Sequence, residues 1–423
     1  MEQFVGVIFH VVHLRVPIHT ASAISALQVA GDALNLPQSD LIMLCGLPGS
    51  GKSWFREALT LRDTTVQILS GDEMGRKYCE RAIGHPRSHT TEVHRSDAGA
   101  ADCASTSSGT VHGVYSFRRG AVGAIRVVLD RCNTTSADRK HFLALASTWA
   151  QHPVAVYFEF EPALCAQRAR RRTDHPSLPQ TGRVDAAISH HQKHSTPPVL
   201  SEGFKSVVRV QSLHASALLA ARLAPPVPLF KFPRTAHLLN LGAATRDDLT
   251  TSLEAIELAP SCEVVITEKV DGANMGFSLS SDGNISIQNR SHHVTHESHA
   301  QFRKLKEYVN MHAAGLHRVL ARDEKFPERF VLFGEWLAAT HSISYTALPS
   351  LFLAFDLYDR VTSSWMDRRQ LEALLDGTGI ELVPVVATLQ NIPTKEELLA
   401  LMDRMSRFTE GPAEGAVRPI TCS

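Results

Sequence analysis

The feature that most constrains the fold is a glycine-rich stretch near the amino terminus, residues 46–53, which reads GLPGSGKS. A short apolar run, residues 40–45, precedes it, and a helical pattern, residues 54–61, follows it. Glycines let successive backbone N–H groups turn toward phosphate oxygens, and the start of the following helix adds the positive end of its dipole. A strand, a loop of this kind and a helix in succession predict an α/β domain with a parallel sheet flanked by helices.

Each part of this loop has an expected role. The backbone that surrounds the phosphates comes from the glycines Gly46, Gly49 and Gly51. Lys52 is expected to reach the β- and γ-phosphates of ATP, and the Ser53 hydroxyl is expected to bind Mg²⁺. The sequence therefore predicts ATP and Mg²⁺ as cofactors, with a purely structural glycine-rich turn as the alternative.

Two carboxylates are predicted at the same edge of the sheet as this loop. Strand-like residues 65–69 run into Asp72, and strand-like residues 124–129 run into Asp130. The carboxyl ends of parallel strands form the edge where ligands bind. One carboxylate there could take a proton from an attacking hydroxyl while the other holds Mg²⁺ or its waters. The alternative for each aspartate is a cap on the following helix.

A basic helix is predicted further along the first half, over residues 165–175. Arg168 and Arg172 lie four residues apart and so share one face, which is either a phosphate clamp or a solvated basic surface. GLPGSGKS, the aspartate after the next strand and LDRCN at residues 129–133 together resemble polynucleotide 5′-hydroxyl kinases. The resemblance implies Asp72 as general base and an arginine-bearing lid to which Arg168 and Arg172 belong. Asp130 is then the carboxylate expected to hold Mg²⁺ or its waters.

The second half is organised around Lys269, within VVITEKVDGANMGF at residues 264–277. An apolar run ends just before this lysine, and Asp271 and Gly272 form the turn after it. A lysine amine attacks phosphorus only when unprotonated, which burial or neighbouring cations favour. Gly272 allows a nucleotide to approach the backbone, and Asp271 could accept a ribose hydroxyl or hold the lysine. A surface turn lysine is the alternative.

Four later stretches follow in a recognisable order: QNRS at 288–291, FGEW at 333–336, LFLAFD at 351–356 and EGAV at 414–417. With EKVDG they resemble ATP-dependent nucleic-acid ligases and capping enzymes, most closely the phage RNA-ligase-2-like branch. The resemblance implies an α+β nucleotidyltransferase domain with antiparallel sheets, in which Lys269 is the nucleophile. It also implies nucleotide contacts from Arg290 to phosphate, from Glu335 to ribose, from Phe355 or Phe352 to adenine, with Phe355 preferred, and from Glu414 to ribose or a metal.

The sequence departs from this family after Glu414. The ligases continue with a strand that carries two lysines in contact with the α-phosphate, whereas Lys395 is the last lysine here. Cations at that place stabilise charge on the phosphorus oxygens and ease deprotonation of the nucleophile. We expect that the chain is truncated, that another basic residue substitutes, or that ligation is impaired.

Composition and prolines set the domain boundaries. We expect an extension at residues 1–35, a P-loop kinase-like domain at 36–222, a linker with three prolines at 223–230 and a ligase-like domain at 231–423.

With 43 basic and 43 acidic residues, the chain has no net charge, so any nucleic-acid surface must be a local patch. Seven scattered cysteines predict an intracellular protein, cytoplasmic or nuclear, and residues 4–14 are too short for a membrane span.

Taken together, the two resemblances predict an enzyme that phosphorylates 5′-hydroxyl ends and seals them through lysyl-AMP. Its partners would be RNA ends, or alternatively DNA ends, together with a separate enzyme that prepares 3′ ends. Three other functions stay open. One is a capping-type transferase that uses GTP, another a kinase whose second domain only binds nucleotide or RNA, and the third a P-loop ATPase that acts as an RNA-binding switch.

Overall fold

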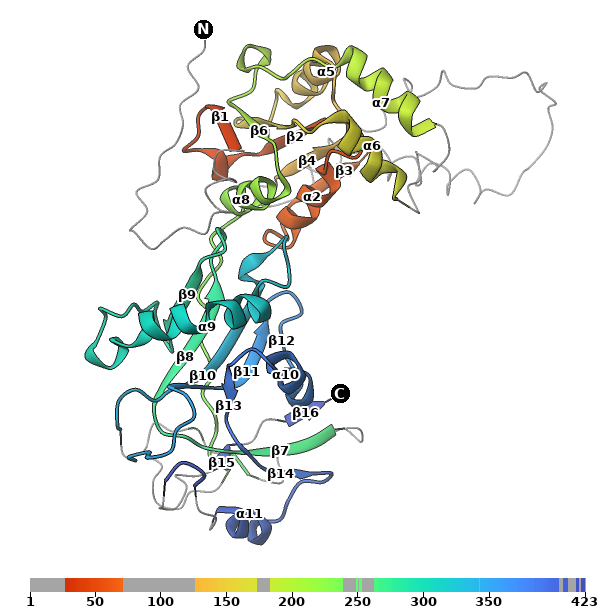
Figure 1. Ribbon diagram of the computed structural model, residues 1–423. Helices are drawn as coiled ribbons and strands as arrows, with labels where there is room; N and C mark the ends of the chain where they lie inside the picture. Colours follow the sequence, from red (N-terminus) through yellow and green to blue (C-terminus); the bar gives the residue numbers. More distant parts are fainter. Residues whose placement is uncertain are drawn as a thin grey trace, which may run out of the picture. The chain divides into compact units, whose positions relative to one another are not determined.

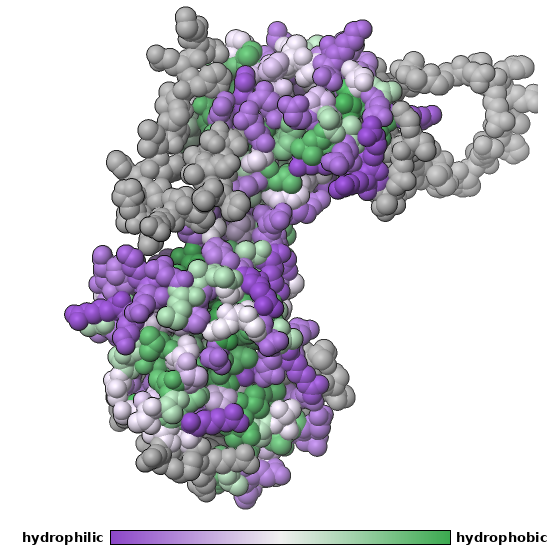
Figure 2. Space-filling view, viewed as in Figure 1, coloured by the Kyte–Doolittle hydropathy of each residue, from purple (hydrophilic) through white to green (hydrophobic). Residues whose placement is uncertain are grey.

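The computed structural model describes residues 27–70, 126–172, 183–238, 249, 251–252, 262–341, 343–402, 406–409, 416–417 and 420–422. The chain divides into two compact units, Met1–Pro226 and Val227–Ser423 (Figure 1). Within the described ranges, no helix has both the length and the apolar composition needed to cross a membrane. On the face drawn in Figure 2, polar residues cover much of both units, with apolar residues scattered between them.

The first unit is built on a six-stranded sheet in the order β1-β6-β5-β2-β4-β3. Its strands are β1 (Leu27–Gly31), β2 (Leu41–Gly46), β3 (Gln67–Ser70), β4 (Val127–Asp130), β5 (Pro153–Phe158) and β6 (Ser206–Val210). Neighbours from β6 to β3 pair in parallel, as the sequence predicted, and β1 adds an antiparallel edge. The expected amino-terminal extension therefore supplies a strand to the sheet of the first unit.

Helices cover both faces of this sheet because its buried strands alternate their side chains between two cores. The helices are α2 (Lys52–Thr60), α5 (Ser136–Ala146), α6 (Pro162–Arg170), α7 (Arg183–His194) and α8 (Leu213–Leu223), with short 3₁₀ turns at Leu36–Gln38 and Leu200–Glu202. Ile42 and Leu44 pack with α2 and α8. Met43 and Cys45 lie on the opposite face, where α5 packs.

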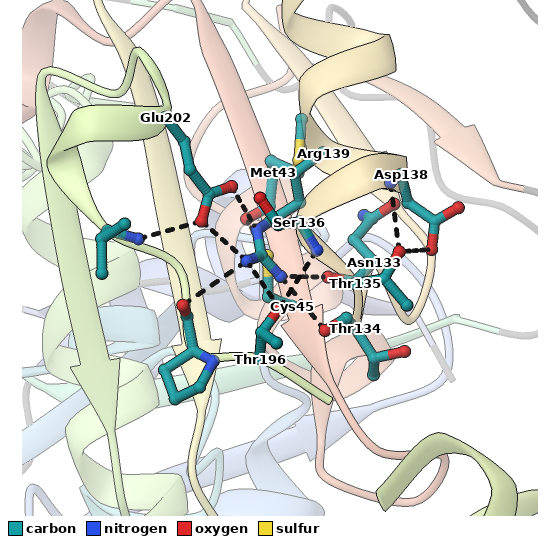
Figure 3. A network of polar contacts seen from close by, with 12 residues as sticks. Met43, Cys45, Asn133, Thr134, Thr135, Ser136, Asp138, Arg139, Thr196 and Glu202 are labelled. Atoms are coloured by element: carbon teal, nitrogen blue, oxygen red, sulfur yellow. Dashed lines mark hydrogen bonds and ion pairs between the residues drawn. The ribbon is translucent and has the colours of Figure 1, made fainter. Parts of the chain in front are cut away.

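A buried arginine fixes α5 to the rest of the unit (Figure 3). Arg139 is fully buried, and its Nε and Nη2 donate to the two carboxylate oxygens of Glu202, each at 2.8 Å. Its Nη1 donates to the carbonyls of Asn133 and Thr134 at 3.0 and 3.2 Å. These bonds connect the loop after β4 to the segment before β6, so they fix the position of the loop at the carboxyl end of β4.

The second unit contains two sheets. The larger one has the order β12-β11-β10-β8-β9, with β13 beside β11, and is built from β8 (Ala273–Leu279), β9 (Ile285–Asn289), β10 (Phe330–Trp336), β11 (Phe352–Asp359), β12 (Ser364–Trp365) and β13 (Glu381–Leu382). The smaller one pairs β7 (Cys262–Glu268) with β14 (Val385–Leu389), β15 (Ala416–Val417) and β16 (Ile420–Cys422). All these pairs are antiparallel except β11 with β13, which confirms the predicted antiparallel sheets.

Helices pack on the outer face of each sheet. They are α9 (Leu305–Leu320), α10 (Arg368–Leu375) and α11 (Lys395–Met402), with 3₁₀ turns at Ala300–Phe302 and Pro327–Arg329. α9 and α10 bury the face of the larger sheet that carries Phe277, Trp336 and Phe352. α11 packs its Leu398 against Val264 and Ile266 of β7. Strands β8 and β9 form a hairpin, joined by a turn in which Gly283 has φ +81°.

The end of the predicted linker belongs to the second unit. The ring of Phe230 stacks on Tyr358 with centroids 3.6 Å apart and planes 13° apart. The Phe230 carbonyl accepts from Gln288 Nε2 at 2.7 Å, and the Pro228 carbonyl accepts from Arg360 Nη1 at 2.9 Å. The second unit therefore includes residues 228–230, which the proline pattern had assigned to the linker.

Candidate active sites

The phosphate loop of the first unit joins the end of β2 to the start of α2. Gly49 and Gly51 have φ values of +81° and +97°, a region that side chains disfavour. A Cβ atom at Gly49 would lie 2.2 Å from the carbonyl oxygen of Cys165, which belongs to α6. The Gly46 N–H donates to the Cys132 carbonyl at 2.8 Å, so the loop after β4 supports the phosphate loop. The loop can hold this shape only with glycine at these positions.

Lys52 points its amine across the loop. Nζ donates to the carbonyls of Gly46 at 3.0 Å and Leu47 at 2.8 Å, and the residue is 8% exposed. Phosphate oxygens would compete with these two carbonyls for the same donor. Ser50 Oγ is buried and has no hydrogen-bond partner within the described residues. Ser53 is the second residue of α2 and is half-buried beside Lys52.

Asp130 ends β4 and lies level with Leu44 of β2 and Ser70 of β3. Its Oδ2 accepts from Arg56 Nη1 at 3.1 Å in an ion pair. Sequence reasoning missed Arg56, although it lies one turn after Lys52 on α2. The cap of α5 is Thr135, so Asp130 does not have the alternative role of capping that helix.

A hydroxyl from Ser53 and a carboxylate from Asp130 are oxygen donors of the kind that Mg²⁺ uses together with phosphate oxygens, so the donor set fits this ion. Asp72 lies outside the described residues. The strand that leads to it, β3, ends at Ser70 at the same edge of the sheet.

The two arginines expected in the lid are not equivalent. α6 ends at Arg170, so the helix predicted to continue to residue 175 is shorter, and Arg172 lies beyond its last turn. Arg168 lies over the ring of Phe160, 5.1 Å from its centroid, and its buried Nη1 has no hydrogen-bond partner within the described part. α6 packs directly on the phosphate loop through Cys165 and Ala169. Arg168 is therefore the arginine that the fold holds on the helix next to this loop.

In the second unit Lys269 follows directly after β7 and is half-buried. The residue before it, Glu268, is 5% exposed, and its carboxylate accepts from Ser406 Oγ at 2.5 Å and from the Arg407 N–H at 3.2 Å. β15 pairs with β7 at the same place, with Ala416 opposite Glu268. The backbone that carries Lys269 is thus fixed on both sides. Glu414, just before β15, lies outside the described residues.

The turn after Lys269 contacts strand β10. The Asp271 N–H donates to the Tyr345 hydroxyl at 2.7 Å, and the Gly272 N–H donates to Glu335 Oε1 at 3.2 Å. A Cβ atom at Gly272 would lie 2.4 Å from the carbonyl oxygen of Trp336. The fold therefore brings together Gly272 and Glu335, which the sequence placed in separate motifs. Tyr345 had no sequence signal, because it lies in an irregular segment between β10 and β11.

Strand β11 carries both phenylalanines that were candidates for stacking on adenine, and it has a β-bulge at Phe355. Phe333 pairs with Asp356 and Gly334 pairs with Ala354, so Phe355 is the extra residue on β11. Phe352 is fully buried in the core against Phe277 and cannot meet a base.

Phe355, by contrast, is half-buried and packs in the same cluster as Val270, the neighbour of Lys269. Its ring also meets Phe232 edge-on, with centroids 5.2 Å apart. Phe355 therefore stays the candidate.

Arg290 lies apart from these groups. It is the first residue after β9 and is exposed, in a turn where the Asn289 N–H donates to the His292 carbonyl at 2.9 Å. Among the described residues the structure does not bring Arg290 into a hydrogen bond or ion pair with the other candidate residues. Its predicted contact with phosphate stays a prediction.

One carboxyl near the second site was not predicted from the sequence. Asp356 follows the bulge residue Phe355, and burial raises its pKa from 3.8 to about 6, while the nearby Arg368 guanidinium acts in the opposite direction. Arg368 is 5% exposed, donates to Glu372 and to the Val383 carbonyl, and keeps a buried Nη1 without a partner in the described part. Neutral Asp356 is therefore favoured at mildly acid pH.

The two units match two different families. Residues 41–194 match the AAA domain family, and residues 262–418 match the RNA ligase family. No curated protein matches the chain.

Solved structures of Naegleria gruberi RNA ligase are similar to part of the chain. A mutant of that ligase with ATP and Mn is 23% identical, over 38% of this chain and 48% of that one, with a TM-score of 0.31. The same ligase with PPi is 25% identical, over 37% and 46%, with a TM-score of 0.30. The chain spans about half the length of these relatives. It thus carries a P-loop domain similar to AAA domains at residues 41–194, followed by a domain similar to RNA ligases at residues 262–418.

Proposed function

We propose that this protein repairs RNA ends with ATP, first by phosphorylating a 5′-hydroxyl and then by joining the new 5′-phosphate to a 3′-hydroxyl. The observation that carries the proposal is the presence of a phosphate-loop motif and a ligase-like lysine motif in one chain. The first unit has a complete phosphate loop around Lys52, and the second has a lysine motif whose Gly272 already contacts Glu335. The family matches over the same two regions support it.

In the first unit the reaction is transfer of the γ-phosphoryl group. The backbone of the loop and Lys52 hold the β- and γ-phosphates, and Arg168 grips oxygens of the group in transfer. Asp72 takes the proton of the 5′-hydroxyl as its oxygen bonds to phosphorus, and ADP leaves. Mg²⁺, bound by Ser53 and Asp130, would neutralise charge on the phosphates.

In the second unit the amine of Lys269 bonds to the α-phosphorus of ATP, and pyrophosphate leaves. Glu335 and Asp271 hold the ribose, Phe355 stacks on adenine, and Arg290 and Glu414 complete the nucleotide contacts. AMP then passes to the 5′-phosphate of RNA, which frees the lysine. Attack by a 3′-hydroxyl forms the phosphodiester and releases AMP. A separate enzyme would supply the 3′-hydroxyl end.

The test uses two labels and two variants of the full chain. ATP labelled at the γ-phosphate should label a 5′-hydroxyl RNA oligonucleotide, and ATP labelled at the α-phosphate should give an acid-labile adduct with the protein. Lys52→Ala should abolish only the first signal, and Lys269→Ala only the second. Lys140→Ala and Lys304→Ala, which change exposed lysines, are the matched controls.

The other outcomes identify the alternatives. Labelling of RNA without an adduct would leave a kinase whose second unit only binds nucleotide or RNA. An adduct with GTP but not ATP would indicate a capping-type transferase. Phosphate release without transfer to RNA would indicate an ATPase switch, and the proposal would then be wrong for the first unit.

A further inference from the structure

Helix α7, which carries His191, packs against α6 (Figure 1). Val184, Ile188 and His191 are spaced at i, i+4 and i+7, so they form one stripe along the helix. Val184 and Ile188 are 2% and 4% exposed and pack with α6 and with Leu47 of the phosphate loop. His191 is half-buried on this stripe, whereas His194 on the same helix is exposed. The imidazole is thus directed to the side of α7 that packs toward the loop.

One ring nitrogen of His191 is held by the loop after β4. Nδ1 lies 3.1 Å from Oγ1 of Thr134, which is 4% exposed. The neighbouring Asn133 donates from Nδ2 to the Leu44 carbonyl at 2.8 Å, in the strand that leads into the phosphate loop. The ring is therefore positioned against the same backbone that positions the loop. The bond to Thr134 uses Nδ1 and leaves Nε2 for a ligand.

The groups around this imidazole are mainly basic. The charged groups that influence its pKa are Lys52 at the start of α2, His190 on its own helix and Asp138 in the first turn of α5. Burial lowers the pKa of His191 most, Lys52 and His190 lower it further, and Asp138 alone raises it. A cationic ring is thus disfavoured here by its surroundings.

Two unpartnered donors lie on the loop and on the helix packed against it. Ser50 Oγ, in the loop, is completely buried, and Nη1 of Arg168, on α6, is buried as well; neither has a partner within the described residues. Buried polar groups without partners are uncommon, and a bound ion or water is one explanation for them. An anion held by the loop would offset the repulsion between Lys52 and a cationic His191, and it would supply an acceptor for Ser50 Oγ and Arg168 Nη1.

We propose that His191 is a phosphate-binding residue of the first unit, which donates from Nε2 to the polyphosphate of a bound nucleotide and takes up a proton from solvent when the nucleotide binds. The inference rests on the proposed nucleotide site around Lys52. It concerns binding alone, because no bond of the nucleotide breaks in this step. The negative charge of the polyphosphate favours the imidazolium, so affinity at this site falls as pH rises.

The direct test observes the ring itself. The full chain, labelled with ¹³C at histidine Cε1, is titrated by NMR with AMP-PNP and Mg²⁺, and the His191 signal is identified by its loss in His191→Gln. The signal should move toward the imidazolium position on binding, and this change should be absent in Lys52→Ala. A signal that stays neutral while Lys52-dependent binding occurs would overturn the inference.

A binding experiment separates this role from a structural one. Binding measured with Lys52→Ala is subtracted, because it reports nucleotide bound by the second unit. After this subtraction, the Kd of His191→Gln for AMP-PNP should be about tenfold higher than that of the wild type, which corresponds to the loss of one charge-assisted hydrogen bond. His191→Gln should also flatten the pH dependence of binding between about pH 6 and 8. His194→Gln, on the same helix, should change neither. A lower melting temperature with an unchanged pH dependence would mean that His191 only supports packing and would contradict the inference.

The two proposals fail in different ways. If His191 gains a proton on binding but no phosphate reaches a 5′-hydroxyl RNA, the kinase proposal fails and the binding role of His191 stands. If RNA is phosphorylated with an unchanged His191 signal, the kinase proposal stands and the role of His191 fails.

Discussion

The backbone N–H of Gly272 donates to Oε1 of Glu335 at 3.2 Å, and this contact joins the turn after Lys269 to strand β10. Glu335 lies opposite Asn274 in the pairing of β10 with β8. Because β8 begins directly after Gly272, the sheet also holds the turn next to Glu335. The turn after Lys269 and the residue proposed to contact ribose are thus held in a fixed position relative to each other.

Replacing Gly272 should disrupt the contact between the turn after Lys269 and strand β10. In Gly272→Ala the new Cβ atom would meet the Trp336 carbonyl at 2.4 Å, so the turn must move away from β10. We expect a loss of about 1–3 kcal/mol of stability and at least a tenfold fall in adduct formation at Lys269. Denaturant unfolding and α-labelled ATP measure the two effects. Gly283→Asn, in an open turn with φ +81° that asparagine tolerates, is the control and should behave as wild type.

Glu335→Gln keeps the hydrogen bond that positions the Gly272 turn but removes the negative charge of the carboxylate. The amide oxygen can still accept from the Gly272 N–H, so we expect the stability to stay within about 0.5 kcal/mol of the wild type. A ribose hydroxyl would bond less strongly to a neutral acceptor, and the KM for ATP in formation of the Lys269 adduct should rise about tenfold. An unchanged KM would exclude Glu335 from the ribose contact.

Breaking the buried pair of Arg139 and Glu202 should unfold the first unit preferentially. Arg139→Met leaves the Glu202 carboxylate buried without its partner, which costs about 3–5 kcal/mol. Arg170→Met breaks a pair with Asp185 whose side chains are 54% and 58% exposed, and it should cost less than about 1 kcal/mol. Urea unfolding compares the two variants, and the Lys269 adduct should form in both. Equal losses would show that the buried network adds no stability.

Asp356→Asn should stabilise the protein in a pH-dependent way. Because burial raises the pKa of Asp356 from 3.8 to about 6, the unfolded chain releases this proton at lower pH than the folded one. Wild-type stability therefore falls as pH rises from about 4 to 6, and the loss is complete above that.

The variant should gain up to about 3 kcal/mol at pH 7 and little near pH 4. Denaturant titrations across this range measure it, with exposed Asp376→Asn as the control. Lower stability of Asp356→Asn at pH 7 would contradict this assignment.

The ring of Phe230 should anchor the start of the second unit. It stacks on Tyr358, and Phe230→Ala removes this contact for an expected loss of about 2 kcal/mol. Phe230→Tyr keeps the ring and should lose less than about 0.5 kcal/mol. Thermal unfolding of the full chain distinguishes the two, and equal melting temperatures for both variants would mean that residues 228–230 act only as a connector.

The local parts of both candidate sites were predicted from the sequence. The phosphate loop depends on glycine conformation and on the strand and helix next to it, which are properties of adjacent residues. Lys269 at the end of a buried strand and the turn at Asp271 and Gly272 likewise follow from an apolar run and from turn residues. These features need no knowledge of distant segments, so pattern and propensity were enough.

Tertiary structure decided the parts that depend on residues far apart in the chain. The burial of Phe352 against Phe277, which leaves Phe355 as the candidate, comes from the packing of α9 and α10 on one face of the larger sheet. The pairing of Arg56 with Asp130 depends on the parallel sheet order, and the contact of His191 with Thr134 depends on how α7 packs. Strand register and helix packing are set by summed burial over many residues, which no short stretch of sequence specifies.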